Sequence, residues 1–205
     1  MNSKLPSDTI GRFLIAIGAI SILAFIFLII FFVGYFNDIP SLYIFGSIND
    51  VLGSLVAVLS AVLATTLIFS QSKRWIWLNL IGAILTWIGV FIVTLDSLMA
   101  GNIIPKNTAA LLRIAHGFPP FLTTHNQGFG FGLIGVWLVI LNFQAFQTKS
   151  WPKHFIGAGF IAAILMTIGL AGSNGALGFV FIYPIWCIWL GRYILRTQER
   201  AINNE

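Results

Sequence analysis

Residues 13–36 read FLIAIGAISILAFIFLIIFFVGYF, an apolar stretch of 24 residues without a charged side chain. A membrane-spanning helix needs ~20 such residues, because each residue advances ~1.5 Å and the hydrocarbon layer is ~30 Å thick. Over the whole chain of 205 residues, 58% are hydrophobic and only 8% are charged. These are too few charges to cover the surface of a water-soluble domain. The sequence therefore predicts an all-α, polytopic integral membrane protein.

Five further apolar stretches follow, separated by polar segments. They predict a bundle of six transmembrane helices that forms one domain over residues 1–205. Pro184 should kink the last of these helices near its middle. The longest polar connection covers residues 100–125. The predicted spans are residues 11–36, 50–70, 75–98, 127–147, 155–172 and 177–195.

The positions of Lys and Arg predict the side of the membrane on which each connection lies. Two of these residues, Lys106 and Arg113, fall at one end of the predicted helices, and the other nine fall at the opposite end. Because cytoplasmic connections are enriched in Lys and Arg, we expect both termini to be cytoplasmic, in a cell or cytoplasmic membrane. The nine residues are Lys4, Arg12, Lys73, Arg74, Lys149, Lys153, Arg192, Arg196 and Arg200.

The formal net charge of +5 does not indicate a nucleic-acid partner, because most basic residues are scattered singly or in pairs between apolar stretches. One regular pattern is present near the C-terminus. If the last helix continues beyond the membrane, Arg192, Arg196 and Arg200 form a single basic stripe. Such a stripe favours contact with anionic lipid at the cytoplasmic face, and a docking site for a cytoplasmic protein is the alternative.

Candidate chemistry lies at the predicted outer end. Asp50 and Asp96 are about equally far from the turn between the second and third helices, so they should reach similar depths on neighbouring helices. Asp50 is expected to cap the first turn of its helix. Asp96 falls in a last turn, where the helix dipole opposes its charge, so a cation from the following loop, Lys106 or Arg113, is its expected partner.

The outer connection also contains His116 and His125. Together with the two aspartates they form a conceivable metal-binding set, but a double proline and nine residues separate the histidines, without a compact ligand motif. We therefore expect no metal and no cofactor. Cys187 lies within an apolar stretch and is expected to be an inert packing residue. The candidate outer-face residues are Asp50, Asp96, Arg113, His116 and His125.

Glycines at positions 128, 130 and 132 begin the fourth predicted span. Small residues let helix backbones approach closely in lipid. We expect them to serve packing within the bundle rather than a dedicated dimer face, although association into homo- or hetero-oligomers stays open.

Two classes of function are consistent with this sequence. In the first, the chain is a non-catalytic membrane component, such as an accessory subunit, a small transporter-like module or a bundle that binds a hydrophobic ligand. In the second, it is an outer-face membrane enzyme that uses Asp50, Asp96, His116 and His125. The first is preferred because an enzyme needs convergent polar groups held by further residues, and the candidates here are few. No residue is assigned a catalytic role.

Overall fold

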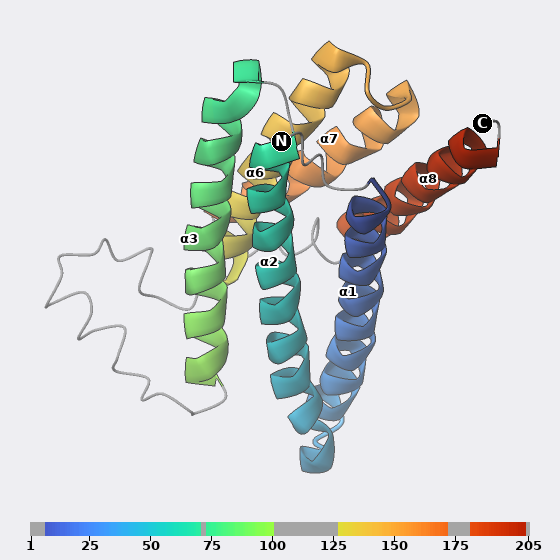
Figure 1. Ribbon diagram of the computed structural model, residues 1–205. Coiled ribbons are helices and arrows are strands. Elements are labelled where there is room, and N and C mark those ends of the chain that lie inside the picture. The colour runs from blue at the N-terminus through green and yellow to red at the C-terminus, as the bar shows by residue number, and fades with distance from the viewer. Residues whose placement is uncertain (1–6, 71–72, 101–126, 172–180, 204–205) are drawn as a thin grey trace, which may run out of the picture.

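The computed structural model describes residues 7–70, 73–100, 127–171 and 181–203 (Figure 1). Regular structure in these ranges is entirely helical, which confirms the predicted all-α class. The elements are α1 (Ser7–Phe36), η1 (Pro40–Leu42), α2 (Ile44–Ser70), η2 (Lys73–Trp75), α3 (Ile76–Ala100), α6 (Gln127–Thr148), α7 (Lys153–Thr167), η3 (Ile168–Ala171) and α8 (Tyr183–Asn203).

Five helical segments of the described residues are long and apolar enough to cross a membrane, which fits a multi-pass membrane protein. They correspond to the first five predicted spans. The sixth predicted span, residues 177–195, begins outside the described residues, and its described part belongs to α8, which continues to Asn203. A count of six spans therefore stays a prediction. The five segments are Asp8–Phe36, Pro40–Ile68, Ile76–Met99, Gln127–Thr148 and Lys153–Leu170.

The helices are packed as a curved row in which each contacts the next. The order along the row is α8, α1, α2, α3, α6 and α7, and a smaller contact between α7 and α8 closes it. The first residues of α1, the end of α2, the turn after α6 and the C-terminal residues of α8 all lie at one end, at the top of Figure 1. We call this the basic end, because it contains Arg12, Arg74, Lys149 and the three arginines of α8.

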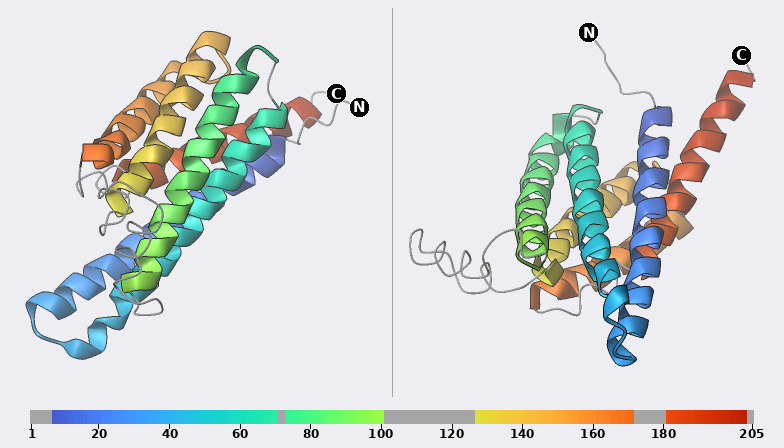
Figure 2. Two further views of the ribbon diagram at one scale, coloured as in Figure 1. Left: turned by 90° about the vertical axis from the view of Figure 1, so that its left-hand side faces the viewer. Right: turned by 90° about the horizontal axis from the view of Figure 1, so that it is seen from below.

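At the other end, α1 and α2 form a hairpin that extends beyond α3 and α6 (Figures 1 and 2). The turn is tight. Asp38 takes a left-handed backbone conformation with φ 54°, and the Ile39 amide donates to the Gly34 carbonyl at 2.8 Å. Pro40 cannot continue a helix, so α1 ends here and a short 3₁₀ turn leads into α2.

Glycines allow neighbouring helices to approach closely. A side chain at Gly89 of α3 would lie 2.5 Å from the Gly130 carbonyl oxygen of α6, and one at Gly132 would lie 2.8 Å from the Leu170 amide nitrogen. Gly130 therefore faces α3, whereas Gly132 faces the segment after α7. A side chain at Gly191 of α8 would lie 2.6 Å from the Gly11 carbonyl oxygen of α1. These contacts confirm that the glycines serve packing within the bundle.

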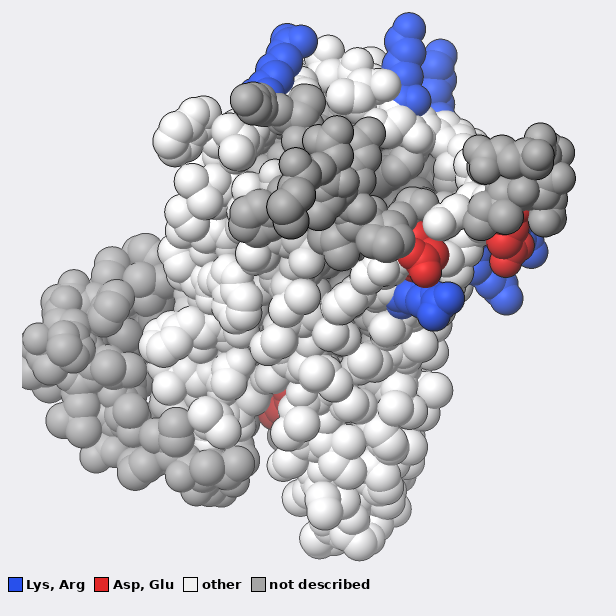
Figure 3. All heavy atoms as spheres, in the orientation of Figure 1, with Lys and Arg blue, Asp and Glu red and all other residues white. Residues whose placement is uncertain are grey.

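The surface between the two ends of the bundle is apolar. Trp77 is 73% exposed, Ile185 64% and Val51 62%. Exposed large side chains of this kind occur along every spanning helix, and in water they would form an extended hydrophobic patch. In Figure 3, Lys and Arg side chains lie toward the basic end, and on the face in view the protruding hairpin presents uncharged side chains. This surface suits a lipid environment rather than water.

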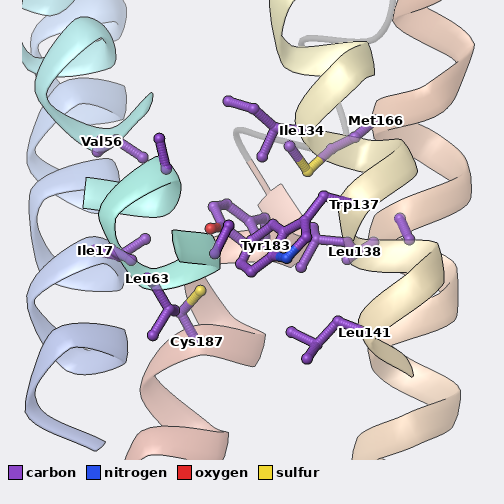
Figure 4. Packing of buried hydrophobic residues seen from close by; sticks show 14 of the residues in the cluster. Ile17, Val56, Leu63, Ile134, Trp137, Leu138, Leu141, Met166, Tyr183 and Cys187 are labelled. Atoms are coloured by element: carbon purple, nitrogen blue, oxygen red, sulfur yellow. The ribbon is translucent and has the colours of Figure 1, made fainter. Parts of the chain in front are cut away.

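Large side chains fill the middle of the bundle (Figure 4). Trp137 of α6 and Tyr183 of α8 are almost completely buried, and the Tyr183 hydroxyl lies 2.9 Å from the Ser60 hydroxyl of α2. Cys187 is fully buried in the same cluster, which confirms its packing role. Pro184 is the second residue of α8, and the described residues directly before this helix, Phe181 and Ile182, are π-helical. The predicted span begins at residue 177, outside the described residues, so the expected kink stays a prediction.

Candidate functional site

The two aspartates predicted to lie at the outer end are neighbours in the structure. Asp50 is in α2 and Asp96 in α3, and the hydroxyl of Ser97, which follows Asp96 directly, lies 3.2 Å from the Asp50 carbonyl oxygen. Asp96 is buried and Asp50 is half-buried. The prediction that they reach similar depths on neighbouring helices is therefore confirmed.

Hydrogen-bond donors from three helices meet at Asp50. Gln127, the first residue of α6, donates from Nε2 to Asp50 Oδ1 at 3.2 Å, and Asn49 donates to the same oxygen at 3.4 Å. The Ser97 hydroxyl of α3 lies 3.2 Å from the Asp50 carbonyl oxygen and 2.9 Å from the Ser54 hydroxyl. These contacts join α2, α3 and α6. We name the group the polar cluster: Asn49, Asp50, Ser54, Asp96, Ser97 and Gln127.

The expected helix-capping role of Asp50 is wrong. Helix α2 begins at Ile44, so Asp50 is its seventh residue and lies beyond the first turn. The backbone N–H groups of the first turn, which a cap would satisfy, are a full turn away. The carboxylate of Asp50 instead accepts hydrogen bonds from the side chains of Gln127 and Asn49.

The other predicted outer-face residues, Arg113, His116 and His125, lie outside the described residues, as does Lys106. The proposed pairing of Asp96 with a cation, and the set of two histidines with two aspartates, are therefore untested. In the part of the chain that the structure describes, no three His, Cys, Asp or Glu side chains come together.

Sequence reasoning missed four members of the polar cluster. Asn49 precedes Asp50 directly, Ser54 lies one turn after Asp50, Ser97 follows Asp96 directly, and Gln127 begins the fourth span. The spacing of Ser54 from Asp50 places both on one helix face and was a usable signal. Serine is common in membrane helices, however, and Gln127 joins the aspartates only through the packing of α6 against α3.

A second polar region lies at the basic end, where a groove of about 380 Å³ separates the start of α7 from the C-terminal half of α8. As predicted, α8 continues as one helix, so Arg192, Arg196 and Arg200 share a face, and all three line this groove. We name it the basic groove. Its lining residues are His154, Phe155, Trp189, Arg192, Tyr193, Arg196, Thr197 and Arg200.

Aromatic rings form the inner wall of the basic groove. The Phe155 ring is buried, with its centroid 4.5 Å from that of Trp189 and 4.9 Å from that of Tyr193. The His154 ring lies 5.1 Å from Trp189. Trp186 anchors the two helices, since its Nε1 donates to the Phe155 carbonyl oxygen at 2.9 Å. Sequence reasoning identified the arginines but not this wall, because the wall depends on where α7 meets α8.

The charges of the arginines in the basic groove are not compensated by a carboxylate of the described residues. Arg192, Arg196 and Arg200 are exposed, and none of them forms an ion pair within the described residues. The ion pair found there joins Arg12 to Asp8 at 3.7 Å on the surface of α1. A guanidinium group remains charged at all physiological pH values. The groove is therefore a concave, positively charged surface with an aromatic wall.

No family model matches this chain, and neither a curated protein nor a solved structure matches it. The chemistry of the polar cluster and of the basic groove is therefore the basis for assigning a function.

Proposed function

We propose that this chain is a non-catalytic, multi-pass component of the cell or cytoplasmic membrane, with six spans and both termini in the cytoplasm. The supporting observation is that polar side chains of this chain hydrogen-bond to one another between helices. In the polar cluster, Ser54, Ser97 and Gln127 hydrogen-bond across three helices, and Gln127 also binds the carboxylate of Asp50. Polar groups that join helices in this way stabilise a membrane bundle.

The buried middle of the bundle favours an accessory subunit over a transporter-like module. Trp137, Leu138 and Tyr183 are almost completely buried there and fill the space between α2, α6 and α8. A transport path would require a polar cavity at this depth. The side chains of Ser60 and Thr86, at similar depth, donate to carbonyl oxygens of their own helices.

The proposed orientation is supported by the basic end. Arg12, Arg74 and Lys149 lie there with the arginines of α8, and the opposite tip, the turn between α1 and α2, contains Asp38 and no Lys or Arg. Cytoplasmic connections of membrane proteins carry an excess of Lys and Arg.

An outer-face membrane enzyme is the second candidate, and one observation favours it. Asp50 and Asp96 lie at similar depth on two neighbouring helices near the end of the bundle, and pairs of carboxylates serve in acid–base chemistry and in metal binding. Under this alternative, His116 and His125 would complete the site.

Metal analysis of the purified full-length protein tests the non-catalytic assignment against the metal-binding form of the second candidate. The variants are Asp50→Asn with Asp96→Asn, and His116→Ala with His125→Ala. We expect less than one metal ion per chain in the wild type and no change in either variant. Asn at position 50 retains a carbonyl oxygen for the Gln127 amide, so the double Asn variant should fold. One divalent ion per wild-type chain that both variants lose would overturn the non-catalytic assignment.

A further inference from the structure

The exposed face of α8 changes character along its length. Phe181, two residues before the helix begins, and Ile185 and Trp189 within it are spaced four residues apart and are 50%, 64% and 46% exposed. At 100° per residue, Arg192 and Arg196 continue the same face of the helix. An apolar stripe therefore runs directly into a basic stripe on one side of α8.

The change from apolar to basic occurs at the level of an aromatic pair. Trp151, in the turn between α6 and α7, has its ring centroid 6.1 Å from that of Trp186. Trp is enriched at the boundary between hydrocarbon and headgroups. Lys149 and Lys153 flank the same turn. These residues place the boundary of the membrane at the foot of the basic groove, so Ile185 would face acyl chains and Arg196 would face headgroups.

We propose that the basic groove and the apolar stripe of α8 together bind one anionic phospholipid. Arg192, Arg196 and Arg200 bind its phosphate group, and its acyl chains lie along Phe181, Ile185 and Trp189. This proposal goes beyond the proposed function and does not depend on it. The sequence analysis predicts general contact between the basic stripe and anionic lipid. The proposal is more specific, because it places one lipid molecule between the arginines and the aromatic wall.

The chemistry of the arginines suits a phosphate ligand. Guanidinium groups bind phosphate oxygens through paired hydrogen bonds, and successive arginines on this face are ~6 Å apart along the helix axis. None of the three is neutralised by a carboxylate within the described residues. The volume of the groove, about 380 Å³, is in the range of small-molecule sites. The negative charge of a phosphate group bound between the arginines would offset their positive charge.

The aromatic wall distinguishes a lipid from a free anion. Phe155, Trp189 and Tyr193 give the groove an apolar side next to the charged one. A free phosphate would gain nothing from this wall, whereas the glycerol and upper acyl carbons of a lipid would bury it. A ligand with a phosphate and a hydrophobic portion therefore fits both sides of the groove.

Lipid binding to the full-length protein in detergent micelles tests the proposal, with bound lipid counted by native mass spectrometry. The probes are dioleoyl phosphatidylglycerol and dioleoyl phosphatidylcholine. The groove variant is Arg192→Gln, Arg196→Gln and Arg200→Gln. The matched control, Arg12→Gln, Arg74→Gln and Lys149→Gln, removes the same charge from exposed residues at the same end but outside the groove.

We expect wild type to bind phosphatidylglycerol at least about tenfold more tightly than phosphatidylcholine, a preference that the groove variant loses and the control variant keeps. If the groove variant and the control variant lose this lipid preference to the same extent, the preference comes from the overall positive charge of the surface and not from a site. That result would overturn the proposal. Unchanged binding in the groove variant would also overturn it. A third arm adds millimolar inorganic phosphate: retention of the lipid is expected, and its complete displacement would identify a free anion as the ligand.

Discussion

The polar cluster and the basic groove lie toward opposite ends of one bundle, and their polar residues are satisfied in different ways. In the polar cluster, Asp50 receives hydrogen bonds from Gln127 and Asn49, and Ser97 links α3 to α2. In the basic groove, Arg192 and Arg196 face outward without carboxylate partners in the described residues. The difference indicates that polar side chains have different roles at the two ends. In the polar cluster they hold helices together, whereas in the basic groove they are free to contact a ligand.

The largest effect is expected where α3 approaches α6 beside the polar cluster. Gly130→Val would place a side chain against backbone, because even a Cβ there lies 2.8 Å from the Gly89 carbonyl oxygen. We expect the free energy of unfolding to fall by about 3 kcal/mol. Gly157→Ala on α7 is the control, since a Cβ there meets nothing within 4 Å. Denaturation in detergent micelles measures both, and a Gly130→Val protein as stable as wild type would contradict the close crossing.

Gln127→Leu tests whether the polar cluster holds the helices together. The change removes the donor to Asp50 Oδ1 and leaves that oxygen with the weaker contact from Asn49. We expect a loss of about 1.5 kcal/mol in the same denaturation measurement. Gln147→Leu, at the exposed far end of the same helix, is the matched control and should be close to neutral. If Gln127→Leu and Gln147→Leu lower the free energy of unfolding equally, the hydrogen bonds that Gln127 makes in the polar cluster contribute nothing to stability.

Gln144→Leu, in the same helix, should have the opposite sign. Gln144 is 2% exposed, and neither its side-chain oxygen nor its nitrogen has a hydrogen-bond partner among the described residues. Replacing an unsatisfied buried amide with a hydrocarbon of similar size removes its desolvation cost. We expect a gain of about 1 kcal/mol. A loss of stability would mean that Gln144 has a partner in the folded protein, which would extend the polar contacts toward the basic end.

The smallest effect is expected midway between the two ends, at the Ser60–Tyr183 hydrogen bond. It joins α2 to α8, but the Ser60 hydroxyl also lies 2.8 Å from the Val56 carbonyl of its own helix. A double-mutant cycle with Ser60→Ala and Tyr183→Phe should give a coupling energy of about 0.6 kcal/mol, typical of hydrogen bonds between membrane helices. A coupling energy near zero would leave α8 held to α2 by packing alone.

The existence of the first five helices could be predicted from the sequence, because membrane thickness demands long apolar stretches such as residues 13–36. The start of α2 could not. The predicted span begins at Asp50, whereas Asp50 lies inside a helix that begins at Ile44. Polar residues end a membrane helix only when no other helix supplies partners, and here Gln127 of α6 supplies one.

Parts of the two candidate sites could also be predicted from the sequence, and other parts could not. Counting residues along two helices was enough to place Asp50 beside Asp96, and the four-residue spacing was enough to place Arg192 and Arg196 on one face. The aromatic wall of the basic groove could not be predicted, because His154 and Phe155 come from α7. Their position depends on the hydrogen bond from Trp186 to the Phe155 carbonyl oxygen, a contact between residues distant in the sequence.

The comparison of the two ends depends on their lying on opposite sides of a membrane, and thiol labelling of sealed vesicles tests this directly. In a Cys187→Ser background, Ser150→Cys places a single thiol at the basic end and Ser41→Cys places one at the tip of the α1–α2 hairpin, both at exposed positions. With a membrane-impermeant reagent, we expect the Ser150→Cys protein to be labelled only in inside-out vesicles and the Ser41→Cys protein only in right-side-out vesicles. Labelling of both from the same side, or of either in both vesicle types, would contradict the proposed arrangement.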